Sequence, residues 1–446
     1  MATVIIAVLP HASHYLPTLK LADDLTRSGH QVIYVSTEQS QRRLVESHGF
    51  GFELLRVADF STLPGSWTDG IPLAGPLLRA RRFLRSLVSD LAGDAVARLV
   101  DRLKPTLVVI ESSLKLFALG VRALGTPVLS LSPFPQTAPG PSAPPPDCGL
   151  IPNGTNASKI EAEWKRYFDA RARSERRYGL LDLSQEAAER KLARLLDLDY
   201  DQTVDARRYH FHVLRGPELC MCPKEFDFPG SGREGRYTAG PGVFEKRSEP
   251  PFDFGFLTRG KPLVYCSLGT IFAERNKTRA NLLRLVGSFA ERTDIELIVS
   301  ADPKIFDTVA RGLPPHIRVF RHVPQLPVLA RASVFLTHAG FSSVREAIFH
   351  GVPMLAMPLG ADQQGVAARI EHHGLGLRMQ LSDAAGKPLL DAFDTLLNDL
   401  RFRENCRGMQ AVFIAEEKRN SAAQVIERLF NLKPRGECKV REAATR

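Results

Sequence analysis

The chain has 446 residues, of which 44% are apolar and 24% are charged, a composition typical of folded globular proteins. This length is too great for one compact core, so two domains are expected. No apolar run is long enough to span a bilayer, which excludes an integral membrane protein, and the net charge of +10 comes without a motif for binding DNA or RNA.

The N-terminal half repeats a pattern of strand, helix and strand. Its opening run, residues 4–9, has neither a basic leader nor a cleavage site, so we expect a buried strand and a cytoplasmic protein. The predicted strands of this half are VIIAVL, QVIYVS, TLVVI and VLSL. Repeated units of this kind indicate a parallel sheet with helices on its faces.

The pattern breaks at residues 133–152, which are rich in proline and glycine, and residues 158–198 then have helical periodicity. We expect a loop and helices inserted into the first domain, where they would shape a substrate pocket. Apolar residues that could line this pocket, or could be core, are Phe83, Leu84, Leu116, Phe117 and Phe134.

Basic residues cluster on two amphipathic helices, at residues 79–85 and 165–177. Such helices often rest on anionic lipid, so a peripheral contact with the inner face of a membrane is one interpretation, and a solvated helix face is the other.

A second series of strands and helices begins at residue 262. The predicted fold is therefore α/β, with two Rossmann-like domains whose parallel sheets face a central cleft. The predicted segments are a first domain at 1–243, a linker at 244–261, a second domain at 262–415, a helix that crosses back at 416–432 and a mobile tail at 433–446.

The loop HAGFSS follows a predicted strand and leads into a helix, so free amides and hydroxyls gather at a helix start, which favours a diphosphate. His338 can donate to a phosphate, Gly340 permits close backbone approach, and Ser342 and Ser343 add hydroxyl donors. Glu346, one turn later, can accept both ribose hydroxyls.

This stretch, from HVPQ to ADQQ, resembles the signature of the family-one UDP-glycosyltransferases, which have the GT-B fold. Within that family it is most similar to carotenoid (zeaxanthin) glucosyltransferases and to macrolide and other natural-product transferases. The resemblance implies that the nucleoside contacts Val323 and Gln325, and that the sugar hydroxyls contact Asp362 and Gln363. It also implies phosphate donors in the turn Ser267-Leu268-Gly269-Thr270.

Two residues of this donor stretch depart from the family pattern. His322 stands where many members stack a tryptophan on uracil, and Ser342 stands where an asparagine is frequent. An imidazole can stack, but it buries less area. The sequence therefore leaves the choice between uridine and thymidine open.

The loop after the first strand carries two histidines, His11 and His14. The spacing of His14 and Pro17 resembles the family's Gly-His-Xaa-Xaa-Pro, which makes His14 the predicted base that removes the proton of the acceptor hydroxyl. His11 is the competitor. Glu111 ends a strand where the family usually has aspartate, and it is the predicted partner of the far imidazole nitrogen.

The motif at Asp197, Asp199 and Asp201 could hold a metal but follows an amphipathic helix, so we interpret it as a solvated helix end. The six cysteines lack the spacing of a zinc site. We expect no metal and no other cofactor.

Together with the resemblance, these residues predict an inverting transfer of a hexose, glucose from UDP-glucose, to a hydroxyl of a small apolar acceptor. The product would be a β-glycoside of a carotenoid, polyketide or phenolic compound. A sugar-nucleotide epimerase and a non-catalytic helper that binds nucleotide sugars are the alternatives; residues His14 and Glu111 count against the helper.

Overall fold

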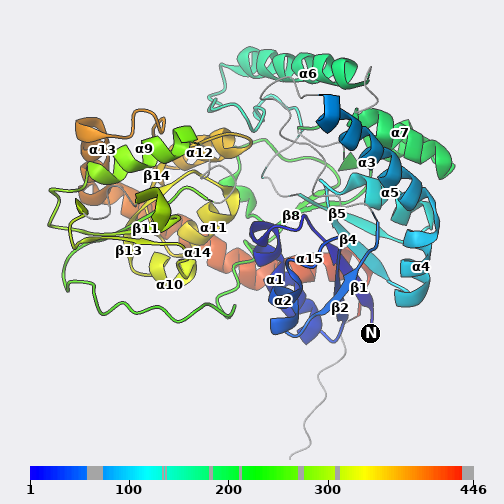
Figure 1. Ribbon diagram of the computed structural model, residues 1–446, viewed down its shortest axis with the longest axis horizontal. Helices are drawn as coiled ribbons and strands as arrows, with labels where there is room; N and C mark the ends of the chain where they lie inside the picture. The colour runs from blue at the N-terminus through cyan, green and yellow to red at the C-terminus, as the bar shows by residue number, and fades with distance from the viewer. Residues whose placement is uncertain are drawn as a thin grey trace, which may run out of the picture.

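A computed structural model of the chain describes residues 1–57, 74–132, 135, 138–179, 184–209, 213–269, 276–306 and 312–433. It has two lobes, each built on a parallel sheet with helices around it (Figure 1). Every pairing within these two sheets is parallel. The prediction of two Rossmann-like α/β domains is therefore confirmed.

The first sheet has seven strands in the order β3-β2-β1-β4-β5-β8-β9. They are β1 (Thr3–Ala7), β2 (Gln31–Ser36), β3 (Gly51–Leu54), β4 (Leu107–Glu111), β5 (Val128–Ser132), β8 (Glu218–Cys220) and β9 (Arg236–Thr238). Val4 and Ile6 of β1 pack into one core layer, and Ile5 packs into the other. Because both faces are buried, the strands are continuous apolar runs.

The helices of the first domain cover both faces of this sheet, except for one that lies on a separate small cluster. They are α1 (Ala12–Arg27), α2 (Arg42–Ser47), α3 (Ala74–Ala92), α4 (Asp94–Leu103), α5 (Lys115–Ala123), α6 (Ala157–Gly179), α7 (Gln185–Leu195) and α8 (Tyr200–Thr203), and β6 (Val204–Asp205) pairs with β7 (Val213–Leu214) in a separate short ladder. In α1 the buried residues Leu21, Ala22 and Leu25 recur at helical spacing, so one side of the helix faces the core.

The second sheet has six strands in the order β12-β11-β10-β13-β14-β15. They are β10 (Leu263–Ser267), β11 (Glu296–Ser300), β12 (Ile317–Phe320), β13 (Ala332–Thr337), β14 (Met354–Ala356) and β15 (Gly376–Arg378). The helices around it are α9 (Asn276–Gly287), α10 (Gln325–Leu329), α11 (Phe341–Phe349), α12 (Gln363–His372) and α13 (Gly386–Asn398).

Each sheet reverses its strand order at one point, between β1 and β4 in the first and between β10 and β13 in the second. Ligands of open parallel sheets bind outside the carboxyl ends of the strands at such points. The predicted residues His14, Glu111, Ser267 and His338 lie at or just after the carboxyl ends of these four strands.

The C-terminal crossing is made by two helices, α14 (Leu400–Arg419) and α15 (Ala422–Phe430), whereas one helix was expected over 416–432. The break falls before Ser421, which begins α15 with a capping box to Gln424. Val425 and Ile426 of α15 pack into the core of the first domain, and Phe413 of α14 packs into the core of the second, so these two helices join the lobes (Figure 1). The predicted tail from residue 434 onward lies outside the described residues.

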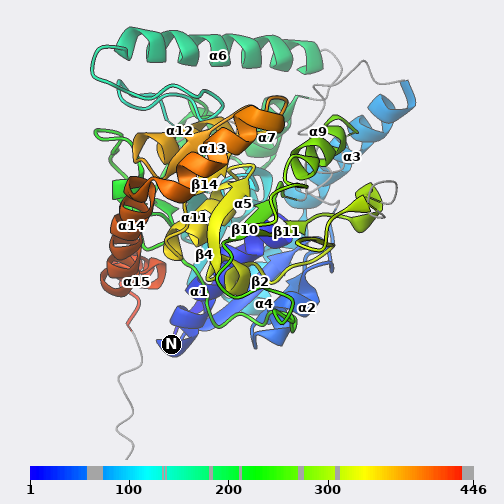
Figure 2. The same ribbon diagram turned by 90° about the vertical axis from the view of Figure 1, so that its left-hand side faces the viewer.

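Helix α6 lies at the edge of the molecule in both views (Figures 1 and 2), on a small cluster that contains Trp164 and Tyr209. The Trp164 indole donates to the Ala143 carbonyl at 2.6 Å, so the inserted loop and α6 form one unit.

The apolar residues proposed for an acceptor pocket are mostly core. Leu84 of α3 and both Leu116 and Phe117 of α5 are buried there, and Phe83 packs against the same cluster. The apolar side of α3 is therefore used inside the first domain. Phe134 lies outside the described residues. None of the described helices is long and apolar enough to cross a membrane.

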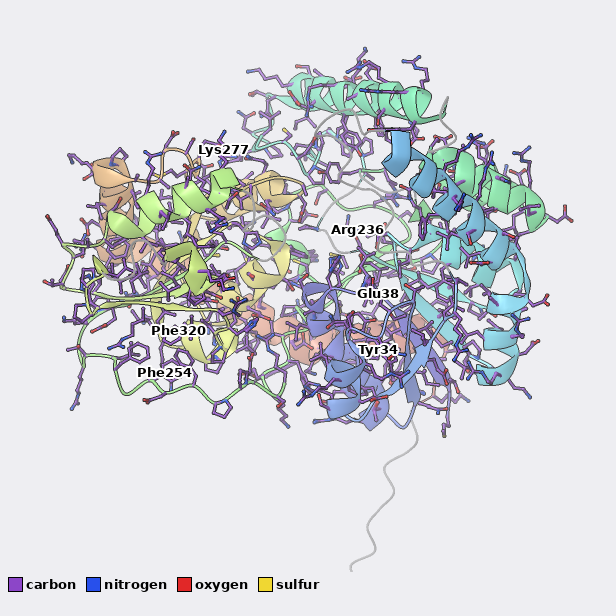
Figure 3. All side chains as sticks on the ribbon, in the orientation of Figure 1. Tyr34, Glu38, Arg236, Phe254, Lys277 and Phe320 are labelled. Atoms are coloured by element: carbon purple, nitrogen blue, oxygen red, sulfur yellow. The ribbon has the colours of Figure 1, made fainter. Side chains whose placement is uncertain are left out.

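The predicted linker, residues 244–261, packs against the second domain through aromatic rings. Figure 3 shows Phe254 and Phe320 on the same lobe, far from Tyr34 of the first. The rings of Phe252 and Phe320 meet edge to face at 4.9 Å, and the Arg331 guanidinium lies 4.2 Å from the centre of Phe254. These contacts hold the linker against the second domain.

Candidate active site

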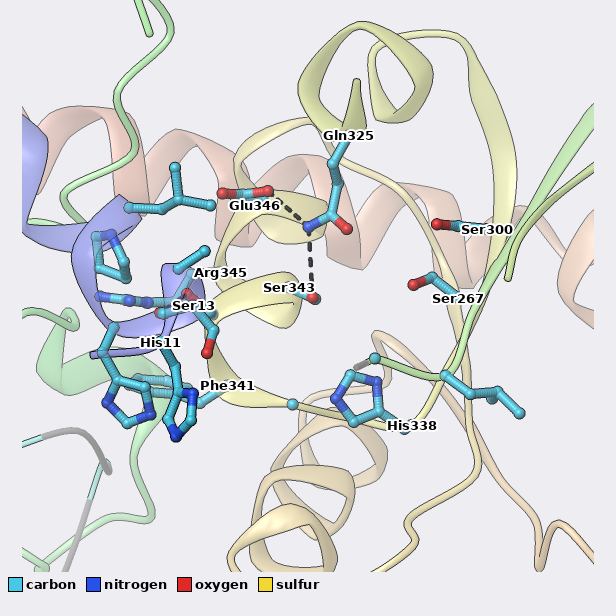
Figure 4. A pocket seen from close by; sticks show the side chains of 18 of the residues that line it. His11, Ser13, Ser267, Ser300, Gln325, His338, Phe341, Ser343, Arg345 and Glu346 are labelled. Carbon is cyan, nitrogen blue, oxygen red and sulfur yellow. Dashed lines mark hydrogen bonds between the residues drawn. The ribbon is translucent and has the colours of Figure 1, made fainter. Parts of the chain in front are cut away.

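A cavity of about 730 Å³ lies between the carboxyl ends of the two sheets. Residues of both domains line it, as Figure 4 shows with His11 and Ser13 on one side and His338, Ser343 and Glu346 on the other. The predicted site residues on its wall are His14, Glu111, Ser267, Gly269, His322, Val323, Gln325, His338, Gly340, Ser342, Ser343, Glu346, Asp362 and Gln363. Thr270 lies outside the described residues.

The two predicted catalytic residues are in contact. His14 lies in the first turn of α1, and its Nδ1 is 2.8 Å from Oε2 of Glu111 at the end of β4. The Glu111 carboxylate also accepts from the Ser113 hydroxyl at 2.6 Å and from the Leu9 amide at 3.3 Å. Glutamate therefore reaches the imidazole in spite of its extra methylene. With Nδ1–H donating to Glu111, Nε2 carries the lone pair that a base needs.

Burial and charge act in opposite directions on this pair. Burial alone lowers the pKa of His14, but the charge of Glu111 and its hydrogen bond outweigh burial, so the pKa of His14 is raised above its ordinary value. Burial alone raises the pKa of Glu111, but His14, Ser113 and the Leu9 amide outweigh it, so the pKa of Glu111 is lowered. The pair thus favours a carboxylate beside an imidazole that readily accepts a proton.

His338 lies between two glycine backbones at the start of α11. A Cβ on Gly269 would come 2.7 Å from its Nε2, and a Cβ on Gly340 would come closer still, so only glycine leaves room for this ring. Burial lowers the pKa of His338 to about 4, against a backbone hydrogen bond to Ser267 that raises it. The ring is therefore neutral at pH 7 and has a single N–H, which a phosphate would take over from the Ser267 carbonyl.

We expect Gly340→Ala to weaken UDP binding by roughly tenfold or more, because the new methyl group displaces the His338 ring and its hydrogen bond to a charged phosphate. Titration calorimetry with UDP measures this loss. Gly287→Ala is the matched control, since a Cβ there meets nothing within 4 Å. Equal UDP affinity in Gly340→Ala and the wild type would contradict the assignment of His338 to the diphosphate.

Ser342 is engaged across the domain interface. Its hydroxyl donates to the Ser13 carbonyl at 3.3 Å. That carbonyl is available because Pro17, four residues later in α1, has no N–H with which to close the helical hydrogen bond. Pro17 thus leaves a carbonyl free for a contact between the domains. The Ser342 hydroxyl, which was expected to bind phosphate, makes that contact.

The nucleoside end of the cavity contains a polar cluster. The Gln325 amide donates to Glu346 Oε2 at 2.7 Å and to the Ser343 hydroxyl at 3.3 Å (Figure 4). The Tyr265 hydroxyl donates to the Gln325 carbonyl oxygen at 3.4 Å. Val323 and His322 precede Gln325 on the same loop and line the cavity. The residues expected at the base and at the ribose therefore lie together.

Asp362 and Gln363 stand at the start of α12 and line the same cavity as His14. Burial raises the pKa of Asp362 to about 7, and backbone hydrogen bonding with the charges of His14 and Arg369 lowers it in part. The Gln363 carbonyl oxygen accepts from the amides of Leu359 and Gly360 at 2.7 and 3.2 Å. This leaves the NH₂ group of Gln363 to meet a sugar hydroxyl.

Sequence reasoning missed Arg247, which was assigned to the linker. Its guanidinium donates to the Glu346 carboxylate within the cavity wall, and its neighbours Ser248 and Glu249 line the same cavity. The sequence carried no signal for this role, because a charged residue in an irregular stretch gives no indication of its distant partner.

The acidic motif that was weighed as a metal site has another role. The Asp199 carboxylate accepts from the amides of Asp201 and Gln202 and begins α8 as its N-cap. Among the residues that the structure describes, no three histidine, cysteine, aspartate or glutamate side chains form a group that could hold a metal ion.

The profile of a family described as UDP-glucoronosyl and UDP-glucosyl transferase matches residues 258–415. The zeaxanthin glucosyltransferase of Pantoea ananas is 26% identical over 445 residues, which cover 94% of this chain and 94% of that protein. The 4'-demethylrebeccamycin synthase of Lentzea aerocolonigenes is 23% identical, and the match covers 96% of this chain and 99% of that protein. The structure of the glycosyltransferase SnogD from Streptomyces nogalater has a TM-score of 0.66 at 18% identity, over 97% of this chain and 99% of that one. That likeness concerns the fold alone.

Proposed function

Because the chain belongs to the family-one UDP-glycosyltransferases, we propose that it transfers glucose from UDP-glucose to a hydroxyl of a small apolar natural product. One observation carries the proposal: the His14–Glu111 pair of the first domain and the donor residues of the second line the same cavity. A protein that only bound the nucleotide sugar would not need that pair.

The proposed reaction is one displacement. His14 Nε2 takes the proton of the acceptor hydroxyl while its oxygen attacks the anomeric carbon, and the bond from that carbon to the diphosphate oxygen breaks. UDP leaves with the electron pair of that bond, beside His338 and the amides at the start of α11. Attack from the face opposite the nucleotide turns an α-linked donor into a β-glycoside.

The proposal for the acceptor class depends on the first-domain residues that line the cavity and on the proteins to which this chain is similar. Leu16, Leu131 and Met221 of the first domain line the cavity together with His14 and give it apolar surface. Two relatives that match over nearly their whole length are a zeaxanthin glucosyltransferase and a 4'-demethylrebeccamycin synthase. A carotenoid, polyketide or phenolic alcohol is the acceptor that we propose.

We expect acceptor-dependent release of UDP from UDP-glucose to be unchanged by EDTA, because His338 and the helix amides offset the charge of the leaving diphosphate. The measurement is UDP release against a panel of carotenoid, polyketide and phenolic alcohols, with EDTA and then with added Mg²⁺. A rate that collapses in EDTA and returns with Mg²⁺ would contradict metal independence. No release from UDP- or dTDP-sugars with any acceptor would favour an epimerase or a binding protein.

A further inference from the structure

Arg247 of the linker is joined to the predicted ribose residue Glu346. Its Nη1 donates to Oε1 of Glu346 and its Nη2 lies 3.4 Å from Oε2, while its Nε donates to Glu249 at 2.6 Å. Both partners are nearly buried: the side chains of Arg247 and Glu346 are 5% and 9% exposed. A guanidinium that donates to one oxygen and lies beside the other restricts the plane of a carboxylate as well as balancing its charge.

Linker residues beside Arg247 contact the first domain. The amide of Ser248 donates to Nε2 of His48 at 3.2 Å, and the His48 ring lies 5.9 Å from that of Phe244. His48 directly follows α2 of the first domain. The backbone next to Arg247 is therefore held by the first domain, while its side chain reaches Glu346 of the second. This arrangement favours a preorganised contact over a side chain that moves freely in the cavity.

The Glu346 carboxylate can still accept hydrogen bonds from two further donors. A carboxylate has about four lone-pair positions. Gln325 takes one on Oε2 and Arg247 takes one on Oε1 and approaches Oε2. Glu346 lines the cavity, and its remaining positions suit the paired 2′- and 3′-hydroxyls of a ribose.

We propose that Arg247 is a specificity-determining residue, which orients Glu346 so that the donor site prefers a ribonucleotide to a 2′-deoxyribonucleotide. This inference rests on the proposed function, because it concerns the nucleoside of the UDP-sugar donor. A 2′-deoxyribose leaves one buried lone pair of Glu346 without a donor, and the loss matters only while Arg247 keeps the carboxylate from turning away.

The test is the ratio of the dissociation constants of dUDP and UDP, two probes that differ only in the 2′-hydroxyl, measured by titration calorimetry. The wild type is expected to bind UDP about 10- to 100-fold more tightly than dUDP. In Arg247→Gln the ratio should fall to about threefold or less. Arg247→Lys should lie between them, since an ammonium group cannot hold both oxygens. The ratio does not depend on the fraction of folded protein.

Arg292→Gln is the matched control, because Arg292 pairs with Asp294 and Asp394 away from the cavity; its ratio should equal that of the wild type. If Arg247→Gln weakens UDP and dUDP by the same factor, or if the wild type binds both equally while still releasing UDP from UDP-glucose, the inference is overturned and the proposed function stands. If the wild type binds neither nucleotide, the proposed function fails and the inference falls with it.

Discussion

His14→Ala is expected to lower the rate of glycosyl transfer by about 100- to 10,000-fold, because the acceptor hydroxyl then loses the base that takes its proton. UDP affinity should stay within about twofold, a change of less than about 0.5 kcal/mol, since His338, Gln325 and Glu346 lie on the other domain. The measurement pairs acceptor-dependent UDP release with UDP titration of the same protein.

The variant His11→Ala tests which of the two histidines of this loop is the catalytic base. His11 is exposed, and its ring lies 6.1 Å from that of His14 without a carboxylate partner in any contact that the structure describes. We expect His11→Ala to keep most of the transfer rate. A larger loss of transfer rate in His11→Ala than in His14→Ala would identify His11 as the base. Equal activity of His14→Ala and the wild type would show that His14 does not act as a base.

The fold was predictable because its strands are buried on both faces. A strand such as β1 must then be apolar throughout, and the helix after it must present one apolar side, as α1 does with Leu21 and Leu25. The C-terminal crossing was predicted as one helix and is two, because a cap at Ser421 outweighs helical periodicity that continues through the break.

The site was predictable where the residues follow strands. His14, Glu111 and His338 each come at a strand end or within a few residues of one, so parallel topology brings them to one edge. The arginine at 247 was not predictable, because its contact with Glu346 joins residues 99 positions apart from an irregular segment. The use of the Ser13 carbonyl by Ser342 likewise depends on how the domains meet.

Glu111→Gln is expected to lower the transfer rate by about two to four orders of magnitude, although the side chain keeps its size. A neutral amide cannot stabilise the imidazolium that forms when His14 takes a proton. If its NH₂ group turns toward Nδ1, the imidazole proton moves to Nε2 and removes the lone pair that the reaction needs. Steady-state transfer rates of both proteins at saturating acceptor measure the loss.

The pH profile distinguishes this role from a structural one. Transfer needs neutral His14, so the wild-type rate should rise with pH through the raised pKa of His14. Glu111→Gln removes the charge that raises this pKa and leaves the burial that lowers it, so the acid limb should move to lower pH. Asp362, whose pKa is about 7, titrates in both proteins, and the difference between the profiles therefore isolates Glu111. A limb that stays in place or moves to higher pH would show that Glu111 does not set the basicity of His14.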